Sequence, residues 1–164
     1  MQQQNELLTA WLKDAYAMEK ALIPVLENHA DDANDHPDVR ERDLRHAEET
    51  KRHADMVEEC LAQLGEKPSR AKSAWGQVMG RVQAMGTAPF RDELTKNFIS
   101  DYGTEQFEIA CYKALVAAAR ATGEDGIASI CEEILADEEE MAMWLYERIE
   151  SAARESLVQA RSRH

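Results

Sequence analysis

Four long stretches of helical periodicity constrain this chain more than any other feature. In each of them apolar residues recur every three or four positions, which is the spacing of one face of an α-helix. The stretches extend over about residues 5–30, 37–64 and 90–122, and from about residue 125 to beyond residue 149. Pro37 suits the first position of a helix, and Gly65 and Gly123 suit the position after one. The sequence therefore predicts an all-α protein with four long helices.

The lengths of the connections predict how these helices are joined. The first and second helices, and the third and fourth, are separated by only a few residues, which favours antiparallel hairpins. The connection over residues 65–89 is long, holds four of the seven glycines, and contains a short apolar stretch at residues 74–85. Two hairpins joined by one long crossover form a ferritin-like four-helix bundle. We therefore expect this fold, with a short extra helix in the crossover.

The length and composition limit the number of domains and the classes of partner. A chain of 164 residues is typical of one domain, so we expect a bundle at residues 1–153 and a polar, flexible tail at residues 154–164. Acidic residues outnumber basic ones 32 to 19, and the net charge of −13 disfavours nucleic acid and anionic lipid as partners. The sequence has no long apolar run, no signal-peptide pattern and no C-x-x-C pair. We expect a cytoplasmic protein without membrane or nucleic-acid partners.

Glutamates occupy positions in the helical stripes where leucines are expected. Because a helix turns about 100° per residue, the direction of each side chain follows from its number. Glutamates in the middle of an apolar stripe are Glu19, Glu105 and Glu138, and Glu108 lies at the edge of the same stripe as Glu105. On the second helix His46 and His53 share a face, and Glu49 lies at its edge, about 60° from His46. Every helix is thus expected to direct a carboxylate inward.

A metal ion would offset the unfavourable burial and mutual repulsion of these carboxylates. An ionised carboxylate that is buried without a partner takes up a proton instead, and several together repel one another. A divalent cation supplies the missing positive charge. Carboxylate oxygens and a neutral imidazole suit iron or manganese, whereas a zinc–sulfur site needs inward thiolates. The pattern predicts a site for iron or manganese, with two ions per chain as in ferritin-like di-metal proteins.

Other interpretations of the same residues remain open. Any single glutamate is also explained by a partly buried salt bridge. The second helix offers either His46 or His53 as its nitrogen ligand, and both are also typical of core histidines. Tyr16 and Tyr112 are typical packing residues, although their hydroxyls could also hydrogen-bond a ligand or quench a radical. The alternative to a redox protein is a structural or interaction protein whose acids are protonated or salt-bridged.

Short motifs in all four helices resemble those of one family. They are Asp14-Ala-Tyr16-Ala-Met-Glu19-Lys20, His46-Ala-Glu48-Glu49-Thr50, Leu64-Gly65-Glu-Lys67-Pro68, Glu105-Gln-Phe-Glu108-Ile-Ala-Cys-Tyr112 and Leu135-Ala-Asp137-Glu138-Glu139. In order and spacing they are similar to the motifs of the YciE/YciF-type family of ferritin-like bacterial stress proteins. The resemblance extends from about Asn5 to Ile149.

The resemblance implies a homodimer with a candidate di-metal site and a role in stress responses. Carried over residue by residue, the metal ligands would be Glu19, His46, Glu49, Glu105, Glu108 and Glu138. With Glu49 and Glu138 bridging two ions, such a protein would oxidise Fe(II) or react with oxygen or peroxide. Ferritin-type helices usually carry Glu-x-x-His, but Arg52 and Met141 occupy the corresponding positions here. A vacant or singly occupied site is therefore the second expectation.

Overall fold

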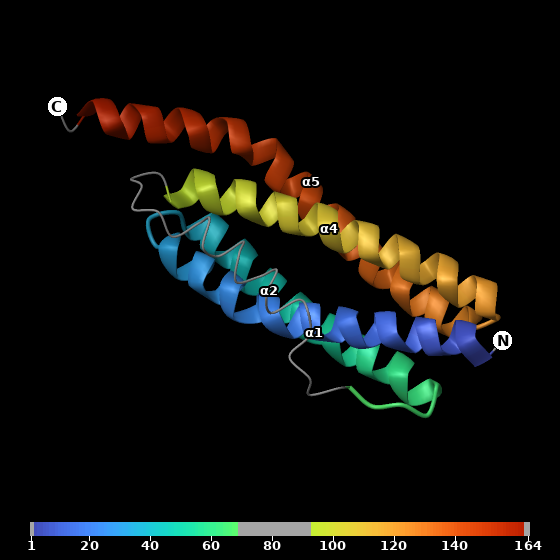
Figure 1. Cartoon of the computed structure of the whole chain (residues 1–164). Coiled ribbons are helices and arrows are strands. Elements are labelled where there is room, and N and C mark those ends of the chain that lie inside the picture. Colours follow the sequence, from blue (N-terminus) through green and yellow to red (C-terminus); the bar gives the residue numbers. More distant parts are fainter. Residues whose placement is uncertain (1, 69–92, 163–164) are drawn as a thin grey trace.

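Four long helices make up the part of the chain that the structure describes. The computed structural model describes residues 2–68 and 93–162. Its helices are α1 (Gln2–Asp32), α2 (Pro37–Gln63), α4 (Glu93–Thr122) and α5 (Asp125–Ser162). No strand occurs within these two ranges. The all-α fold class predicted from the periodicity is confirmed (Figure 1).

The helices form two antiparallel hairpins that lie side by side. α1 packs along α2 and α4 packs along α5, and the hairpins meet where α1 contacts α4 and where α2 contacts α5. α2 ends at one end of the bundle and α4 begins at the other, so these two helices run in the same direction (Figure 1). This is the predicted ferritin-like connectivity. The extra helix expected at residues 74–85 lies outside the described residues.

Residues at the helix ends explain where the helices start and stop. Pro37 lies in the first turn of α2, where its missing N–H leaves no hydrogen bond unmade. Gly65 follows the end of α2 with a φ of 73°, and Gly123 follows α4 with a φ of 80°. Glycine adopts this left-handed region without the steric cost of a side chain. These residues therefore set the ends of both hairpins as the sequence predicted.

Helix α5 is longer than the sequence predicts. It continues to Ser162, through most of the segment expected to be a flexible tail. Ala152 is buried, and the hydroxyls of Thr95 and Ser156 lie 2.9 Å apart, so contacts with α4 support this part of α5. Residues 154–162 are helical, and a domain boundary at residue 153 stays a prediction.

Apolar side chains fill the bundle in two separate clusters. The larger cluster lies toward the connection between α4 and α5 and includes Leu61 and Ile134. The smaller cluster lies toward the connection between α1 and α2 and includes Val39, Phe98 and Leu145. Buried acids and histidines lie between the two clusters. We call these side chains the polar layer, and the candidate site lies within it.

Candidate metal centre

All four helices contribute titratable side chains to the polar layer. The contributors at the centre of the bundle are Glu19 of α1, His46 and His53 of α2, Glu105 and Glu108 of α4, and Glu138 of α5. Each of these residues is at most 2% exposed. The neighbours of Glu19 and Glu138 three and four positions away are apolar and mostly buried, so the packing of α1 and α5 carries these two glutamates into the interior. The corresponding neighbours of His46 on α2 are polar.

Two groups of three residues bring their ligand atoms close enough together to hold a metal ion. One group consists of Glu19, His53 and Glu138, and the other consists of His46, Glu105 and Glu138. Within each group, one ligand atom from every residue lies within 4.8 Å of the others. Glu138 belongs to both groups, so its carboxylate is the one that could be shared by two ions.

Each histidine directs one ring nitrogen at the inward acids. His53 Nδ1 lies 2.9 Å from Glu138 Oε1 and 4.0 Å from Glu19 Oε2. His46 Nε2 lies 3.0 Å from Glu105 Oε1 and 3.9 Å from Glu138 Oε2. The sequence left open which histidine reaches the centre, and the structure places one in each group.

The second ring nitrogen of each histidine contacts a carboxylate at the rim of the site. His46 Nδ1 lies 3.2 Å from Glu49 Oε2, which also accepts a hydrogen bond of 2.9 Å from Arg42. His53 Nε2 lies 3.1 Å from Asp137 Oδ2. Carboxylates in this position fix the ring orientation and raise the basicity of a metal-ligating imidazole. Both histidines are therefore arranged as ligands usually are in metal centres.

Glu49 lies outside the two groups, although the sequence predicts it to be a bridging ligand. Its side chain is 26% exposed, and its oxygens contact Arg42, Arg45 and His46. Burial alone would raise the pKa of Glu49, but hydrogen bonds from His46 and Arg42 lower it to about 2. Glu49 lies at the edge of the helical face, about 60° from His46. It therefore contacts the outer ring nitrogen of His46, a candidate ligand, and is not itself part of either group.

Glu108 lies beside the two groups without belonging to either. It is 2% exposed, and burial together with the negative charges of Glu138 and Glu19 raises its pKa well above the usual range. Glu108 therefore faces the same interior charges as the residues of the two groups.

The two tyrosines lie in different surroundings. Tyr112 is fully buried, and its hydroxyl donates a hydrogen bond to Glu19 Oε1. Tyr16 is half-buried, and burial and the charges of Glu58 and Asp55 on α2 raise its pKa. Tyr112 therefore lies at the centre, whereas the charges that act on Tyr16 come from the outer part of α2.

Protons balance the charges of these groups in the absence of cations. Burial and the charge of Glu138 raise the pKa of Glu19 to about 8, and burial raises that of Glu105 to about 8 despite the opposing effect of His46. Burial works against a charged His53, but the contact with Glu138 raises its pKa to about 9. A bound cation would displace these protons, because metal ligands bind in their deprotonated forms.

Several buried ligand atoms have no hydrogen-bond partner within residues 2–68 and 93–162. These atoms include Glu19 Oε2, Glu105 Oε2 and Glu138 Oε2, and His53 Nδ1 and Glu138 Oε1, which lie 2.9 Å apart, have no partner besides each other. Buried polar atoms are rarely left in this state, because each costs about 1–3 kcal/mol. All of them belong to the two groups, and they are oxygen and nitrogen donors without sulfur. The donor set therefore fits iron or manganese.

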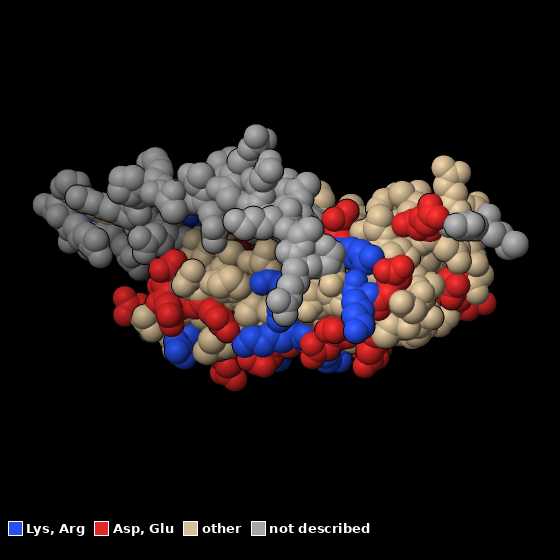
Figure 2. Space-filling view, turned by 60° about the horizontal axis from the view of Figure 1, so that its bottom comes forward, with Lys and Arg blue, Asp and Glu red and all other residues tan. Residues whose placement is uncertain are grey.

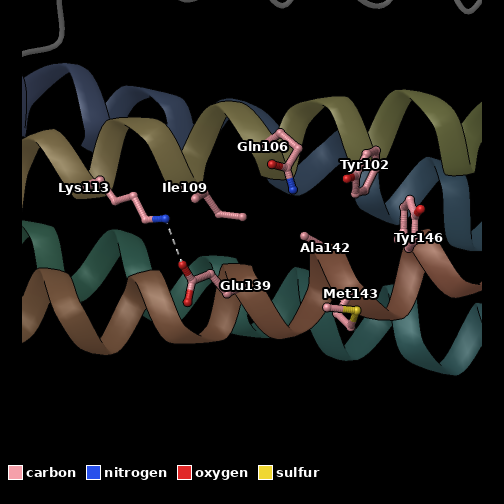
Figure 3. A pocket seen from close by; sticks show the side chains of 8 residues that line it. All are labelled: Tyr102, Gln106, Ile109, Lys113, Glu139, Ala142, Met143 and Tyr146. Atoms are coloured by element: carbon pink, nitrogen blue, oxygen red, sulfur yellow. Dashed lines mark ion pairs between the residues drawn. The ribbon is translucent and has the colours of Figure 1, made fainter.

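The outer face of α4 and α5 carries a groove that is separate from the metal centre. The groove has a volume of about 440 Å³ and lies between α4 and α5 (Figure 3). Lys113 and Glu139 form an ion pair of 3.2 Å across it, and Tyr102 and Tyr146 line it farther along. Glu139 directly follows Glu138 in the sequence, but about 100° of helical rotation turns it outward. The groove therefore belongs to the surface, while the candidate ligands lie inside.

Two polar contacts in the structure were missed by the sequence analysis. Asp137 was not among the predicted site residues, and it contacts His53. His29 lies in the last turn of α1, and the sequence did not predict its contact with Asp101, whose Oδ1 is 2.8 Å from His29 Nδ1. The only available signal was that Asp101 and Asp43 interrupt apolar stripes as the glutamates do.

Similar proteins support the fold and identify the family. Residues 3–158 match the family model described as "Domain of unknown function (DUF892)". A protein of Xanthomonas campestris pv. campestris (XCC3681) is 38% identical, with a TM-score of 0.82 over 96% of this chain and 99% of that chain. The Escherichia coli stress protein YciF has a TM-score of 0.82 at 20% identity, over 94% of this chain and 99% of that chain. The bacterioferritin BfrA of Mycobacterium tuberculosis has a TM-score of 0.74 at 18% identity, over 94% and 92%.

These similarities confirm the ferritin-like four-helix bundle and agree with the motifs that resemble YciE/YciF-type proteins. Within the described parts of the chain, none of the helices has the length and apolar character needed to cross a membrane. The match of the family model covers nearly the whole sequence. The chain therefore belongs to the DUF892 family, the family of YciE/YciF-type proteins.

Proposed function

We propose that this protein binds two iron or manganese ions in the polar layer of its bundle. Glu19, His53 and Glu138 would hold one ion, and His46, Glu105 and Glu138 would hold the other. The observation that carries this proposal is that Glu19, Glu105 and Glu138 of the two groups each bury a carboxylate oxygen without a hydrogen-bond partner. The structural similarity to a bacterioferritin agrees with iron as the bound metal.

The residues around the two groups have distinct tasks in this proposal. Glu138 supplies a carboxylate to both positions, and Glu19 and Glu105 neutralise the charge of the ions. Glu49 and Asp137 hold the two imidazoles in the orientation that directs a nitrogen inward. The hydroxyl of Tyr112 donates a hydrogen bond to one oxygen of Glu19 and leaves the other oxygen available for a ligand position. Burial of the residues of the two groups excludes bulk water.

Iron or manganese bound in this way would supply the redox chemistry for a reaction with oxygen or peroxide, including the oxidation of Fe(II). We propose that this chemistry serves a stress response, which agrees with the description of the similar Escherichia coli protein as a stress protein. We also propose that the protein is a cytoplasmic homodimer. Tyr112 is the tyrosine placed to hydrogen-bond groups at the centre, whereas the surroundings of Tyr16 give no support for a catalytic role.

Metal analysis after anaerobic loading tests the proposal. Chelator-treated protein is incubated with Fe(II) or Mn(II), separated from free metal and analysed. We expect about two ions per chain for the wild type and a loss of both in Glu138→Gln, because both groups use this carboxylate. Glu140→Gln is the matched control, since Glu140 lies on the same helix with an exposed side chain. A wild type without stoichiometric metal, or without consumption of oxygen or peroxide when loaded, would favour the structural alternative.

A further inference from the structure

Two free cysteines lie in the larger apolar cluster, outside the metal centre. Cys60 is on α2 and Cys131 is on α5, and both side chains are 0% exposed. Both belong to the cluster toward the end of the bundle where α4 is connected to α5. Neither belongs to the two groups of the metal centre. The proposed di-metal function therefore leaves these thiols without a role.

The antiparallel register of α2 and α5 places the two cysteines opposite each other. His53 Nδ1 on α2 lies 2.9 Å from Glu138 Oε1 on α5. Cys60 follows His53 by seven residues, and Cys131 precedes Glu138 by seven. On antiparallel helices these two steps lead in the same direction and cover the same distance, about two turns or 10.5 Å. The cysteines therefore face each other as His53 and Glu138 do.

A second contact between the same helices lies beyond the cysteines and supports this register. A Cβ atom at Gly126, near the start of α5, would lie 3.5 Å from Gln63 Oε1 at the end of α2. Cys60 and Cys131 thus lie between two positions at which α2 and α5 touch. Their thiols are hydrogen-bonded to each other, which lowers the pKa of Cys60 against the effect of burial and, together with burial, raises the pKa of Cys131. Cys60 is thus the readier of the two to lose its proton.

Two packed helices can be joined by a disulfide at such a position. Helix axes lie about 8–10 Å apart and Cα atoms about 2.3 Å from each axis, so facing Cα atoms approach to about 3.4–5.4 Å. Disulfides span Cα separations of about 4.4–6.8 Å. A bond between the two sulfurs is therefore compatible with the packing of α2 on α5.

The position near the end of the bundle gives an oxidant access to the buried thiols. Cys60 lies in the last turn of α2, and Cys131 lies in the second turn of α5. Helix ends open locally at a lower free energy than the middle of a helix. Small molecules can therefore reach these thiols without global unfolding.

The surface charge favours a neutral oxidant. Figure 2 shows acidic side chains in several groups on the face that it presents, and the chain carries a net charge of −13. Such a surface repels anionic oxidants, including glutathione disulfide. Hydrogen peroxide is small and neutral, so it is the oxidant that fits this pair.

We propose that Cys60 and Cys131 are a peroxide-sensitive pair that forms a reversible disulfide between the two hairpins. The Cys60 thiolate attacks one oxygen of hydrogen peroxide, and the O–O bond breaks. Cys60 becomes a sulfenic acid, and the leaving hydroxide takes up the proton that Cys60 released and forms water. The sulfur of Cys131 then attacks Cys60 Sγ, the S–O bond breaks, and the proton of Cys131 joins the leaving hydroxide as a second water. Two thiols are thus oxidised to a disulfide while one peroxide is reduced to two waters.

Mass spectrometry of peroxide-treated protein tests the proposal, which requires no bound metal. Reduced protein is treated with hydrogen peroxide in the presence of a chelator, the remaining thiols are alkylated in denaturant, and proteolytic fragments are analysed without reduction. We expect a Cys60–Cys131 disulfide in the wild type. Cys111 should be recovered as an alkylated thiol, because burial and the charges of Asp14 and Glu19 raise its pKa to about 11. The Tm should rise by about 5–15 °C on oxidation and return to its original value when a reductant is added.

Cys131→Ala and Cys111→Ala are the matched variants. Cys131→Ala should show neither the disulfide nor the rise in Tm, and its Cys60 should end as a sulfenic or sulfinic acid. Cys111→Ala should behave as the wild type. A wild type whose Cys60 and Cys131 stay unmodified when folded but react in urea would overturn the proposal, and so would a disulfide from Cys60 to Cys111 or to another copy of the chain. Because the assay is free of metal, none of these outcomes depends on the proposed di-metal function.

Discussion

His53 and Asp137 are joined through Nε2 and Oδ2 at 3.1 Å, and this contact determines which ring nitrogen of His53 faces the interior. The other nitrogen, Nδ1, is thereby left 2.9 Å from Glu138 Oε1. Asp137 is itself held by an ion pair with Arg52 at the surface. The orientation of a buried histidine is thus controlled by a residue that is partly exposed.

The Asp137→Asn variant should weaken one of the two cation positions. Loss of a carboxylate behind a ligating imidazole typically lowers metal affinity by about 10–100-fold. We expect this loss at the position that includes His53, and Glu49→Gln should have the same effect at the position that includes His46. Titration calorimetry with Mn(II) distinguishes the two positions. Glu139→Gln, which removes only the surface pair with Lys113, is the control; an equal loss in this variant would contradict the assignment.

Cation binding should stabilise the fold. A ligand that binds only the folded state at a hundredfold excess over its Kd adds about 2.7 kcal/mol to the free energy of unfolding. For a domain of this size that corresponds to an increase in Tm of roughly 5–10 °C. Differential scanning calorimetry with and without a chelator measures the change, and Glu138→Gln should remove most of it. If the chelator leaves the wild-type Tm unchanged, the interior is not a metal centre.

The stability of the metal-free protein should depend on pH through Asp43. The folded carboxyl has a pKa of about 7, against an ordinary value of 3.8, because of burial and Asp101. Between these values the folded state holds the proton that the unfolded chain has released, so stability falls as the pH rises through this window. Asp43→Asn should therefore gain stability relative to the wild type between pH 4 and pH 7.5, as measured by urea unfolding with a chelator. A constant difference between the two proteins would contradict the burial of an uncompensated Asp43.

Two glycines should respond to alanine in opposite directions. Gly123 has a φ of 80°, where a side chain costs about 1–2 kcal/mol, so Gly123→Ala should lower the free energy of unfolding by that amount. Gly103 lies inside α4 with open space around its Cβ position, so Gly103→Ala should raise it by about 0.5–1 kcal/mol. Urea denaturation of both variants measures the contrast. A destabilised Gly103→Ala would show that α4 is constrained at this position by something other than helix propensity.

Helical rotation alone predicted much of this centre. Glu19, Glu105 and Glu138 interrupt apolar stripes, and a residue in the middle of such a stripe faces the interior whatever the other helices do. The ferritin-like connectivity followed from the lengths of the connections for a similar reason, because short connections leave little choice of direction.

Residues at the edge of a stripe could not be assigned in this way. Glu49 and Asp137 both lie beside inward positions, and their partners depend on how α2 packs against its neighbours. Arg42 draws Glu49 away from the centre, whereas the packing of α5 on α2 brings Asp137 to His53. A single sequence gives the direction of each side chain on its own helix but not the rotation of that helix against the next.

The division of the core into two apolar clusters has a consequence for the motions of the bundle. The two clusters are separate, and without cations the acids and imidazoles of the polar layer lie between them. When one end of the bundle unfolds locally, the apolar side chains at the other end can then stay buried. Amide hydrogens at the two ends should therefore exchange with solvent with different free energies of opening. Ions that crosslink all four helices at the midpoint would merge the two ends into a single cooperative unit.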